Sequence, residues 1–381
     1  MNGRQRILNL LSGRTPLHDP TQGLAWNALV DTYTLSAMPA EVQAQTVVDF
    51  CRRIGCDVIQ LGDFSLPPEL WAGDSFEAIL PEVSVQETVE PGDLTVRHTQ
   101  TPWGELIATF RRSHPLKYPV TNLAELDILK NIWLATRYVP AGPAWEEAYR
   151  RLDAHIGEDG IYTHFLWPSP VQRLIQYDLG MENFYYLLHD QPEKLEDLMA
   201  IMQRRWLESL EIACAHTPAD VIISAENTST TLLSPSLYQR YSLPHLQQFV
   251  EVVHRHQKKA VLHMCGWIRQ LLPLICQTGL DGIHALTPPT IGDTPFDAAM
   301  DAFRPSGALP CAVILMGILD GRVFHAETVT AREIREFLDR LYTPRLRQAN
   351  FILIVAADGL PTPLWKFEAV QEWMAKNGGR S

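Results

Sequence analysis

The sequence predicts an α/β fold with a parallel sheet, a (β/α)8 TIM barrel formed as a single domain by residues 1–381. Short apolar segments alternate with longer segments of helical periodicity, which is the pattern of parallel strands joined by crossover helices. Eight apolar segments of this kind occur, and 381 residues suit one barrel with insertions. No Gly-, Ser- or Pro-rich linker divides the chain, so we expect one domain.

The eight predicted strands are short and rich in aliphatic, β-branched or aromatic residues, as expected for strands that are buried on both faces. They are residues 23–27, 57–62, 161–166, 220–225, 260–264, 282–286, 312–318 and 351–356. Helical patterns lie between them at residues 41–54, 191–217, 234–256, 328–341 and 364–376. Ser234 and Pro235 fit the N-cap and first position of the third of these helices.

Residues 83–111 interrupt the alternation of strands and helices. Their polarity alternates with period two, and turn-forming residues occur near 91–93 and 102–104. This pattern is typical of antiparallel strands with one solvated face. We therefore predict a β-hairpin insertion after strand two, which either packs over the barrel mouth or is a surface hairpin without function.

Composition and charge narrow the class of partner. The formal net charge of -12 disfavours nucleic acid and anionic membranes, because both repel an acidic surface. No run of about 18 apolar residues predicts a transmembrane helix, and the opening residues do not resemble a signal peptide. The six scattered cysteines are expected to be free thiols, so we predict a cytoplasmic protein. Because the charge disfavours nucleic acid and membranes, we expect its substrate to be a small molecule.

The most specific local motif is His263-Met264-Cys265-Gly266 at the end of predicted strand five. Residues two apart on a strand point the same way, so His263 and Cys265 are able to face one metal ion. Imidazole and thiolate together suit Zn²⁺, which needs at least one further protein ligand. The alternative is a packed strand end that carries an inert thiol.

Three carboxylates follow predicted strands at the end where barrel enzymes carry their active sites. Asp63 follows strand two, Glu226 follows strand four and Asp358 follows strand eight. We predict catalytic roles for all three, and Asp358 is also the candidate third metal ligand. Each has a structural alternative, because Asp and Glu at such positions also cap turns and loops.

Four further residues are candidates for substrate binding. Trp26 and Asn27 end predicted strand one, and Trp167 ends strand three. Their side chains either wall a pocket or plug the end of the barrel. His284 lies within strand six and is either a ligand-binding residue or a satisfied core histidine.

The order of several segments resembles the uroporphyrinogen decarboxylase superfamily over nearly the whole chain. The matching segments are the opening helix at residues 1–16, the strand-two segment 57–67 ending near Asp63, the helix start at 190–195, Ser234-Pro235 with Tyr238, Tyr241 and Pro244, the motif His263-x-Cys265-Gly266, residues 317–320, and strand eight with its Gly-x-Pro tail. The resemblance implies a barrel with its active site at the carboxyl ends of the strands.

Two of the several branches of the superfamily imply different chemistry. In the zinc methyltransferase branch, a His-x-Cys pair and a later Cys bind zinc, and a methyl group moves between a corrinoid protein and a thiol. His263 and Cys265 match this pair, with Asp358 standing in place of the later Cys. The resemblance therefore implies zinc, a thiol substrate, a corrinoid donor on a partner protein, and a homodimer as is common in the superfamily.

The other branch decarboxylates uroporphyrinogen without a cofactor, using an Asp after strand two that Asp63 matches. However, the arginine-bearing element that binds the substrate carboxylates is absent, and residues 23–31 stand in its place. Methyl transfer is therefore the leading hypothesis and decarboxylation of a tetrapyrrole acid is the alternative. The departures from both branches leave a third reading, a non-catalytic barrel that binds a tetrapyrrole or corrinoid.

Overall fold

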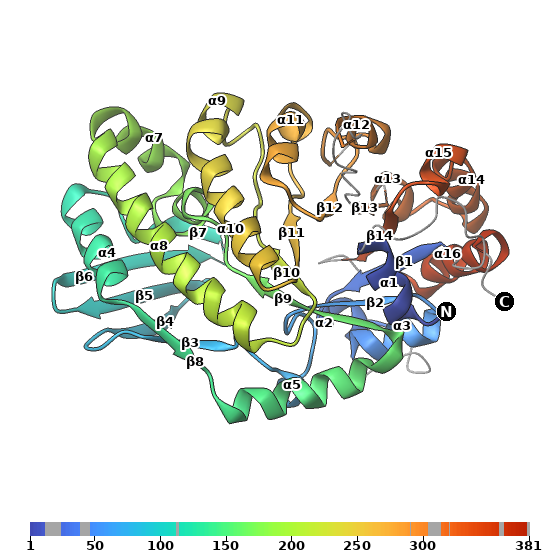
Figure 1. Ribbon diagram of the computed structural model, residues 1–381, viewed down its shortest axis with the longest axis horizontal. Coiled ribbons are helices and arrows are strands. Elements are labelled where there is room, and N and C mark those ends of the chain that lie inside the picture. The colour runs from blue at the N-terminus through green and yellow to red at the C-terminus, as the bar shows by residue number, and fades with distance from the viewer. Residues whose placement is uncertain are drawn as a thin grey trace.

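A computed structural model describes residues 1–11, 24–38, 46–111, 114–289, 291–303, 314–319, 321–357 and 362–378 of the protein. Eight parallel strands form one sheet in the order β1-β14-β13-β12-β11-β10-β9-β2. The strands are β1 (Ala25–Val30), β2 (Val58–Leu61), β9 (Gly160–Leu166), β10 (Val221–Ser224), β11 (Lys259–His263), β12 (Gly282–Leu286), β13 (Ile314–Ile318) and β14 (Phe351–Ala357). The sheet is nearly closed on itself and surrounded by helices, which is the predicted (β/α)8 architecture (Figure 1).

The helices are of two kinds, long ones that cover the barrel and short ones in the loops. They are α1 (Gly3–Leu11), α2 (Thr32–Ser36), α3 (Val47–Ile54), α4 (Leu123–Ala135), α5 (Pro143–Ile156), α6 (Pro170–Arg173), α7 (Gly180–Asp190), α8 (Pro192–His216), α9 (Pro235–Leu237), α10 (Leu243–Arg255), α11 (Leu272–Ile275), α12 (Phe296–Ala302), α13 (Gly321–Phe324), α14 (Ala331–Leu341), α15 (Pro344–Arg347) and α16 (Leu364–Asn377). The Ser234 hydroxyl accepts a hydrogen bond from the Leu237 amide and caps α9 as predicted.

All eight predicted strands occur in the predicted chain order, but the first was placed too early. Predicted strand one was residues 23–27, whereas β1 runs over Ala25–Val30. Trp26 and Asn27 therefore lie near the beginning of this strand and not at its carboxyl end. The Trp-Asn pair interrupted the apolar run, and the prediction stopped there, although both side chains are buried.

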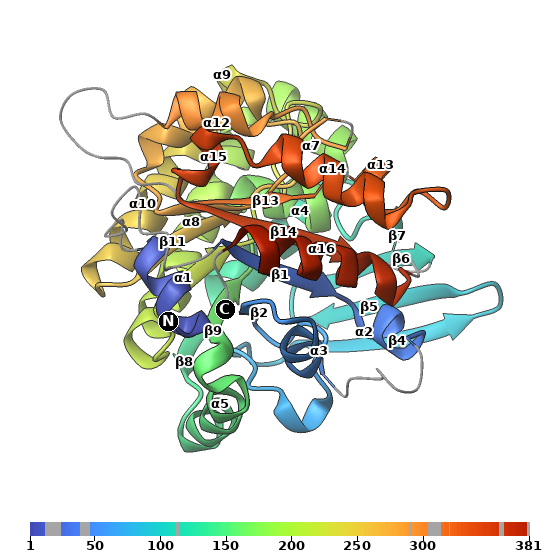
Figure 2. The ribbon, with the colours of Figure 1, turned by 90° about the vertical axis from the view of Figure 1, so that its right-hand side faces the viewer.

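The interior of the barrel is apolar at the end where the strands begin. Alternate strand residues such as Ile161, Val221 and Val261 point inward and pack on Ile7 and Leu11 of α1. In Figure 2, α1 lies at the end of β1 opposite to its arrowhead, so it covers the floor of the barrel. The opposite end, where the strands finish, is the mouth.

Asp57 joins the two terminal strands of the sheet, β1 and β2. Its backbone N–H donates to the Trp26 carbonyl at 2.8 Å, and its carbonyl accepts from the Asn27 amide at 2.9 Å. Its carboxylate accepts the Trp26 N–H at 3.3 Å and pairs with Arg6 of α1 at 2.5 Å. One buried side chain thus links the barrel seam to the helix that covers the floor.

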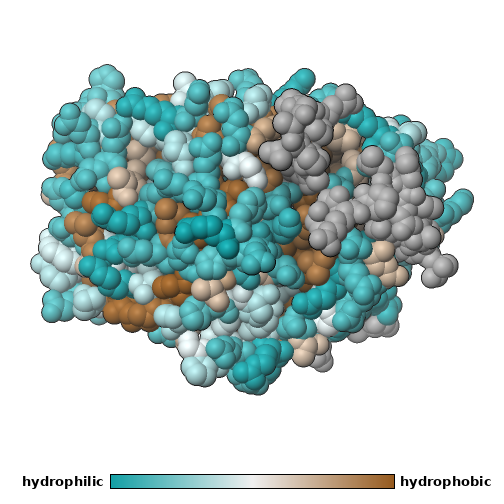
Figure 3. All heavy atoms as spheres, viewed as in Figure 1, coloured by the Kyte–Doolittle hydropathy of each residue, from teal (hydrophilic) through white to brown (hydrophobic). Residues whose placement is uncertain are grey.

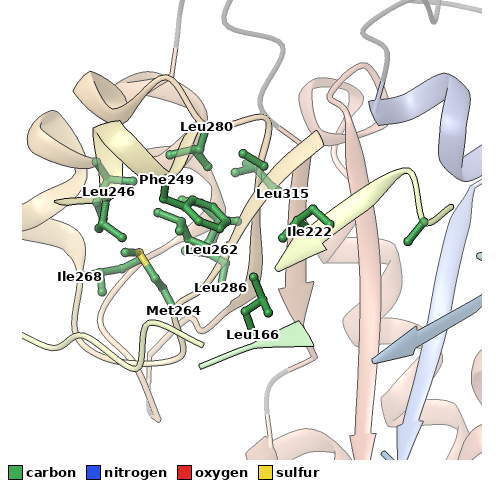
Figure 4. Packing of buried hydrophobic residues seen from close by; sticks show 14 of the residues in the cluster. Leu166, Ile222, Leu246, Phe249, Leu262, Met264, Ile268, Leu280, Leu286 and Leu315 are labelled. Carbon is green, nitrogen blue, oxygen red and sulfur yellow. The ribbon is translucent and has the colours of Figure 1, made fainter. Parts of the chain in front are cut away.

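A second apolar layer lies between the strands and the outer helices. Figure 4 shows Phe249 and Leu246 of α10 beside Leu262 and Leu286, which point outward from β11 and β12. The outer surface seen in Figure 3 is mostly hydrophilic, with small separate apolar patches. Among the described helices, none is long and apolar enough to cross a membrane.

The segment between β2 and β9 is larger than the predicted hairpin. It contains a four-stranded antiparallel sheet, in the order β4 (Ser84–Glu90), β5 (Leu94–Thr101), β6 (Gly104–Arg111) and β7 (His114–Lys117), and a two-stranded ribbon of β3 (Phe76–Ile79) and β8 (Arg137–Pro140).

This insertion packs on the flank of the barrel. The buried residues of β6 face α4, which in turn packs on α8. In Figure 2, β4 and β5 extend on the side toward which β1 points. The insertion therefore packs on the outer helices of the barrel and extends toward the side of the mouth.

Replacing Asp57 by Ala is expected to lower the free energy of unfolding by about 3–5 kcal/mol, because it removes the carboxylate that pairs with the buried Arg6 guanidinium. Chemical denaturation followed by circular dichroism measures this change. Asp153→Ala is the matched control, since it breaks the more exposed ion pair of Arg4 on the same helix and should cost less than about 1 kcal/mol. Equal losses in the two variants would contradict the role given to Asp57.

Candidate active site

The interior of the barrel becomes polar near the mouth, where two histidines face each other. His263 is the last residue of β11, and the register pairs it with His284 of β12. Their Nδ1 atoms are 2.8 Å apart, and Phe165 of β9 lies edge-on to the His263 ring at 6.0 Å. His263 and His284 were separate candidates in the sequence, and the parallel register brings them together.

Burial determines the charge of this histidine pair. It lowers the pKa of His263 to about 4, and it holds the pKa of His284 well below its ordinary value. Both rings are therefore neutral at pH 7. A hydrogen bond between two neutral Nδ1 atoms requires that one carries the hydrogen and the other accepts it, so the tautomers of the two rings are coupled.

A distortion of β12 lies directly after His284. Ala285 has a φ of 62°, and the pairing of β12 with β13 shifts register between His284 and Leu286. A left-handed conformation is unfavourable for alanine, so tertiary contacts must hold it. Bulges of this kind redirect neighbouring side chains, and here the bulge accompanies the residue that meets His263.

Cys265 lies just beyond the end of β11, next to the loop that follows β10. Its thiol donates to the Asn227 side-chain oxygen at 3.5 Å, and the Asn227 amide donates to Gln176 at 3.4 Å. Burial raises the pKa of Cys265. Without a nearby cation this residue is therefore a neutral thiol at pH 7.

Gly266 explains why the two loops approach so closely. A Cβ atom at this position would lie 2.5 Å from the Thr228 carbonyl oxygen and 2.7 Å from the Ser229 Cβ. Only glycine fits without a shift of the backbone. The glycine of the His-x-Cys-Gly motif thus holds Cys265 beside Asn227.

Glu226 is fully buried and fastens two loops together. Its carboxylate accepts hydrogen bonds from the Ser169 backbone N–H, from the Ser169 hydroxyl at 2.9 Å and from the Ser224 hydroxyl at 3.1 Å. Burial raises its pKa, and the bonds from Ser169 and Ser224 oppose that rise. This environment favours the loop-capping alternative for Glu226, which sets the position of Asn227.

Asp63 organises the loop after β2. One carboxylate oxygen accepts the Ala72 N–H and the other accepts the Gly73 N–H, both at 2.8 Å. Burial and then the Asp63 charge raise the pKa of the following Asp74 to about 6. The contacts of Asp63 are those of a turn-forming residue.

The remaining candidates are placed as follows. Trp167 follows β9 at the mouth and is 53% exposed, so it is available to a ligand. Trp26 and Asn27 lie at the floor end of β1, and Asn27 is engaged with Asp57. Asp358 lies outside the described residues.

The donor types at the mouth fit zinc, because neutral imidazole and thiolate are its usual ligands. His263 and Cys265 remain the candidates for holding such an ion, with His284 beside them. Within the described ranges, no group of three His, Cys, Asp or Glu residues is arranged to hold a metal ion. The described residues thus supply part of a ligand set.

Sequence reasoning missed Asn227, Gln176 and Phe165, which contact the motif residues. Asn227 directly follows Glu226 at the end of β10, and its polarity at the mouth was the available signal. Nothing in the sequence marks Gln176, which lies in a π-helical turn, Leu174–Asp178, after α6.

Comparisons with known proteins agree with this architecture. The model of the uroporphyrinogen decarboxylase (URO-D) family matches residues 173–363, half of the chain. A methyltransferase from Methanosarcina mazei aligns over 99% of both chains with 12% identity and a TM-score of 0.58, which shows a shared fold.

A structure of the pneumococcal virulence factor StrH covers 94% of this chain and 83% of its own, with 10% identity and a TM-score of 0.40. That score is too low to support an argument about this chain. The search of curated proteins found no match.

The neutral state of His284 predicts a loss of stability in acid. Its folded pKa lies below the value of about 6.5 in unfolded chains. Below pH 6.5 the unfolded chain therefore binds a proton that the folded chain does not, and stability falls as the pH falls. At pH 5 this effect costs at most about 2 kcal/mol.

His284→Gln should therefore lose up to about 2 kcal/mol less than the wild type between pH 7 and pH 5, as measured by urea unfolding at each pH. His189→Gln, at a site 89% exposed, should keep the wild-type dependence. An unchanged acid sensitivity in His284→Gln would show that the ring is not held neutral.

Proposed function

The chain belongs to the uroporphyrinogen decarboxylase family, and from this premise we propose that it transfers a methyl group to a thiol at a zinc ion in the barrel mouth. His263 and Cys265 would hold the zinc, with Asp358 as the third ligand. The observation that carries the proposal is the contact between the His263 and His284 Nδ1 atoms at 2.8 Å.

The histidine contact is the arrangement that a metal-binding imidazole requires. A histidine ligand usually donates its other ring N–H to a neighbouring acceptor, which fixes its tautomer and orientation. We assign the shared hydrogen to His263 Nδ1 and the accepting lone pair to His284 Nδ1. His263 Nε2 is then unprotonated and free to bind the ion, and His284 acts as a positioning residue.

Cys265 and its neighbours fit the same role. Burial and the Asn227 oxygen both favour the neutral thiol, so Cys265 becomes a thiolate only when a cation is bound. Zinc at this position would lower the pKa of a bound substrate thiol and so supply a nucleophile at neutral pH. Glu226 and Gly266 hold the loop that carries Asn227. Asn227 would therefore stay beside Cys265 when the thiol loses its proton.

The methyl donor we propose is a corrinoid carried by a partner protein. Exposed aromatic residues follow three different strands at the mouth: Phe64 after β2, Trp167 after β9 and Trp267 after β11. Large exposed aromatic side chains at one rim are typical of surfaces that bind flat ligands or partner proteins. All three residues follow the carboxyl ends of barrel strands, on the side of the mouth.

Decarboxylation of a tetrapyrrole acid has weaker support. That reaction would rely on the Asp63 carboxylate, and both of its oxygens already accept loop N–H groups. These contacts give Asp63 a role in the loop that does not involve a substrate.

The proposal is tested by zinc titration and by transfer of methyl from methylcobalamin to 2-mercaptoethanol. His263→Ala and Cys265→Ser should abolish tight zinc binding and transfer. His284→Ala should weaken zinc binding about 10–100-fold, the usual effect of removing a partner of a metal ligand. Cys276→Ser is the control. Cys276 directly follows α11 and is not part of the proposed site, so this variant should keep the wild-type zinc affinity.

Two results would contradict the proposal. The first is wild-type protein that neither retains zinc nor gains activity when zinc is added. The second is carboxyl loss from uroporphyrinogen in the absence of metal, abolished by Asp63→Asn, which would establish the decarboxylase reading instead.

A further inference from the structure

A cavity of about 310 Å³ lies outside the barrel, between the helix α8 and the insertion. Its walls come from β3, β8, α4, α8 and the segment from Trp167 to Arg173 that follows β9. These elements lie together beside α8 in Figure 1. The cavity is separate from the histidine pair, because none of its lining residues belongs to β10, β11 or β12.

The walls of this cavity are aromatic. Phe76, Trp133, Tyr138, Trp167 and Trp206 all line it. Side chains of this kind bind flat apolar groups through buried area and ring stacking. The volume is at the lower end of the range of about 300–1,000 Å³ for small-molecule sites, so it suits a ligand with one ring or two fused rings.

Arg173 is the only cation among the described lining residues, and aromatic rings hold it in place. Its guanidinium carbon is 5.4 Å from the Trp167 ring centre and 5.7 Å from that of Trp133. Its Nε donates to Asp178 at 3.1 Å. Its two Nη groups donate no hydrogen bond to any described residue, so they present paired N–H donors, the arrangement that binds a carboxylate with two bonds.

Asp74 is the other charged residue of the cavity, and the charges of both Arg173 and Asp74 act on the Tyr138 phenol. Burial raises the pKa of the Tyr138 phenol, while the Arg173 charge lowers it and the Asp74 charge adds to the rise. Asp74 itself has no ion pair with Arg173. The cavity lining thus contains one cation and one carboxylate that are not paired with each other.

We propose that this cavity is a second binding site, for a small aromatic carboxylic acid whose carboxylate pairs with the Nη groups of Arg173 and whose ring lies among Trp133, Tyr138 and Trp167. This site goes beyond the proposed methyl transfer and does not depend on it. Asp74 in the lining disfavours ligands with a second carboxylate, because its charge would repel that group.

Isothermal titration calorimetry of the full chain tests the site with three probes of one shape. Indole-3-acetate should bind, whereas indole-3-ethanol and tryptamine, which lack the carboxylate, should bind about 10–100-fold more weakly, as expected for the loss of hydrogen bonds to a charged group. Arg173→Lys keeps the charge but loses the paired geometry, and it should weaken indole-3-acetate binding about tenfold or more.

Ala78→Trp is a variant that changes neither Arg173 nor its buried partner Asp178. Ala78 lines the cavity from the exposed strand β3, so a tryptophan there should fill the space and abolish binding. Glu77→Trp is the matched control, since the adjacent residue does not line the cavity and should leave binding unchanged.

Thermal unfolding of each variant establishes that it is folded. The proposal is overturned if indole-3-acetate does not bind the wild type, if tryptamine binds as tightly as indole-3-acetate, or if Ala78→Trp binds like the wild type.

Discussion

Closure of the sheet depends on Asp57, which links β1, β2 and α1 through its backbone and its carboxylate. Parallel strands carry their functional residues at their carboxyl ends, and a closed barrel brings all of these ends to one opening. An open sheet would spread Asp63 and Trp167 away from the carboxyl end of β14. The presence of Asp63, Trp167 and the histidine pair at the same end of the barrel is therefore a consequence of the seam.

The barrel interior changes character along its axis, and this gradient positions the candidate chemistry. Near the floor, aliphatic residues pack on α1 and exclude water. Two residues further along the strands, toward the mouth, His263 and His284 replace aliphatic residues at inward positions. The apolar surroundings keep both rings neutral, and the bulge at Ala285 shows that the backbone is distorted where the two side chains meet.

Strand order and most helices could be predicted from the sequence because buried parallel strands are short, apolar and separated by helical periodicity. Residue contacts across strands could not be predicted in the same way. His284 was treated as a lone residue, since its pairing with His263 depends on the register of β11 and β12. Trp26 was placed at the wrong end of β1, because a polar Asn27 within a buried strand looks like a strand end.

The loop residues show a similar limit. A carboxylate after a strand has the same sequence signature whether it faces a substrate or caps a turn. Glu226 and Asp63 prove to be engaged with loop N–H and hydroxyl groups. The neighbouring Asn227 contacts Cys265. The motif His-x-Cys-Gly was informative because each named residue makes a different contact. His263 meets His284, Cys265 contacts Asn227, and Gly266 allows the two loops to approach closely.

The central claim, that His263 and Cys265 hold a zinc ion, is tested most directly by X-ray absorption at the zinc edge of the reconstituted protein. The expected first shell contains one sulfur near about 2.3 Å and nitrogen near about 2.0–2.1 Å, and the sulfur should disappear in Cys265→Ser. A shell of oxygen and nitrogen alone, identical in the wild type and in Cys265→Ser, would contradict the account.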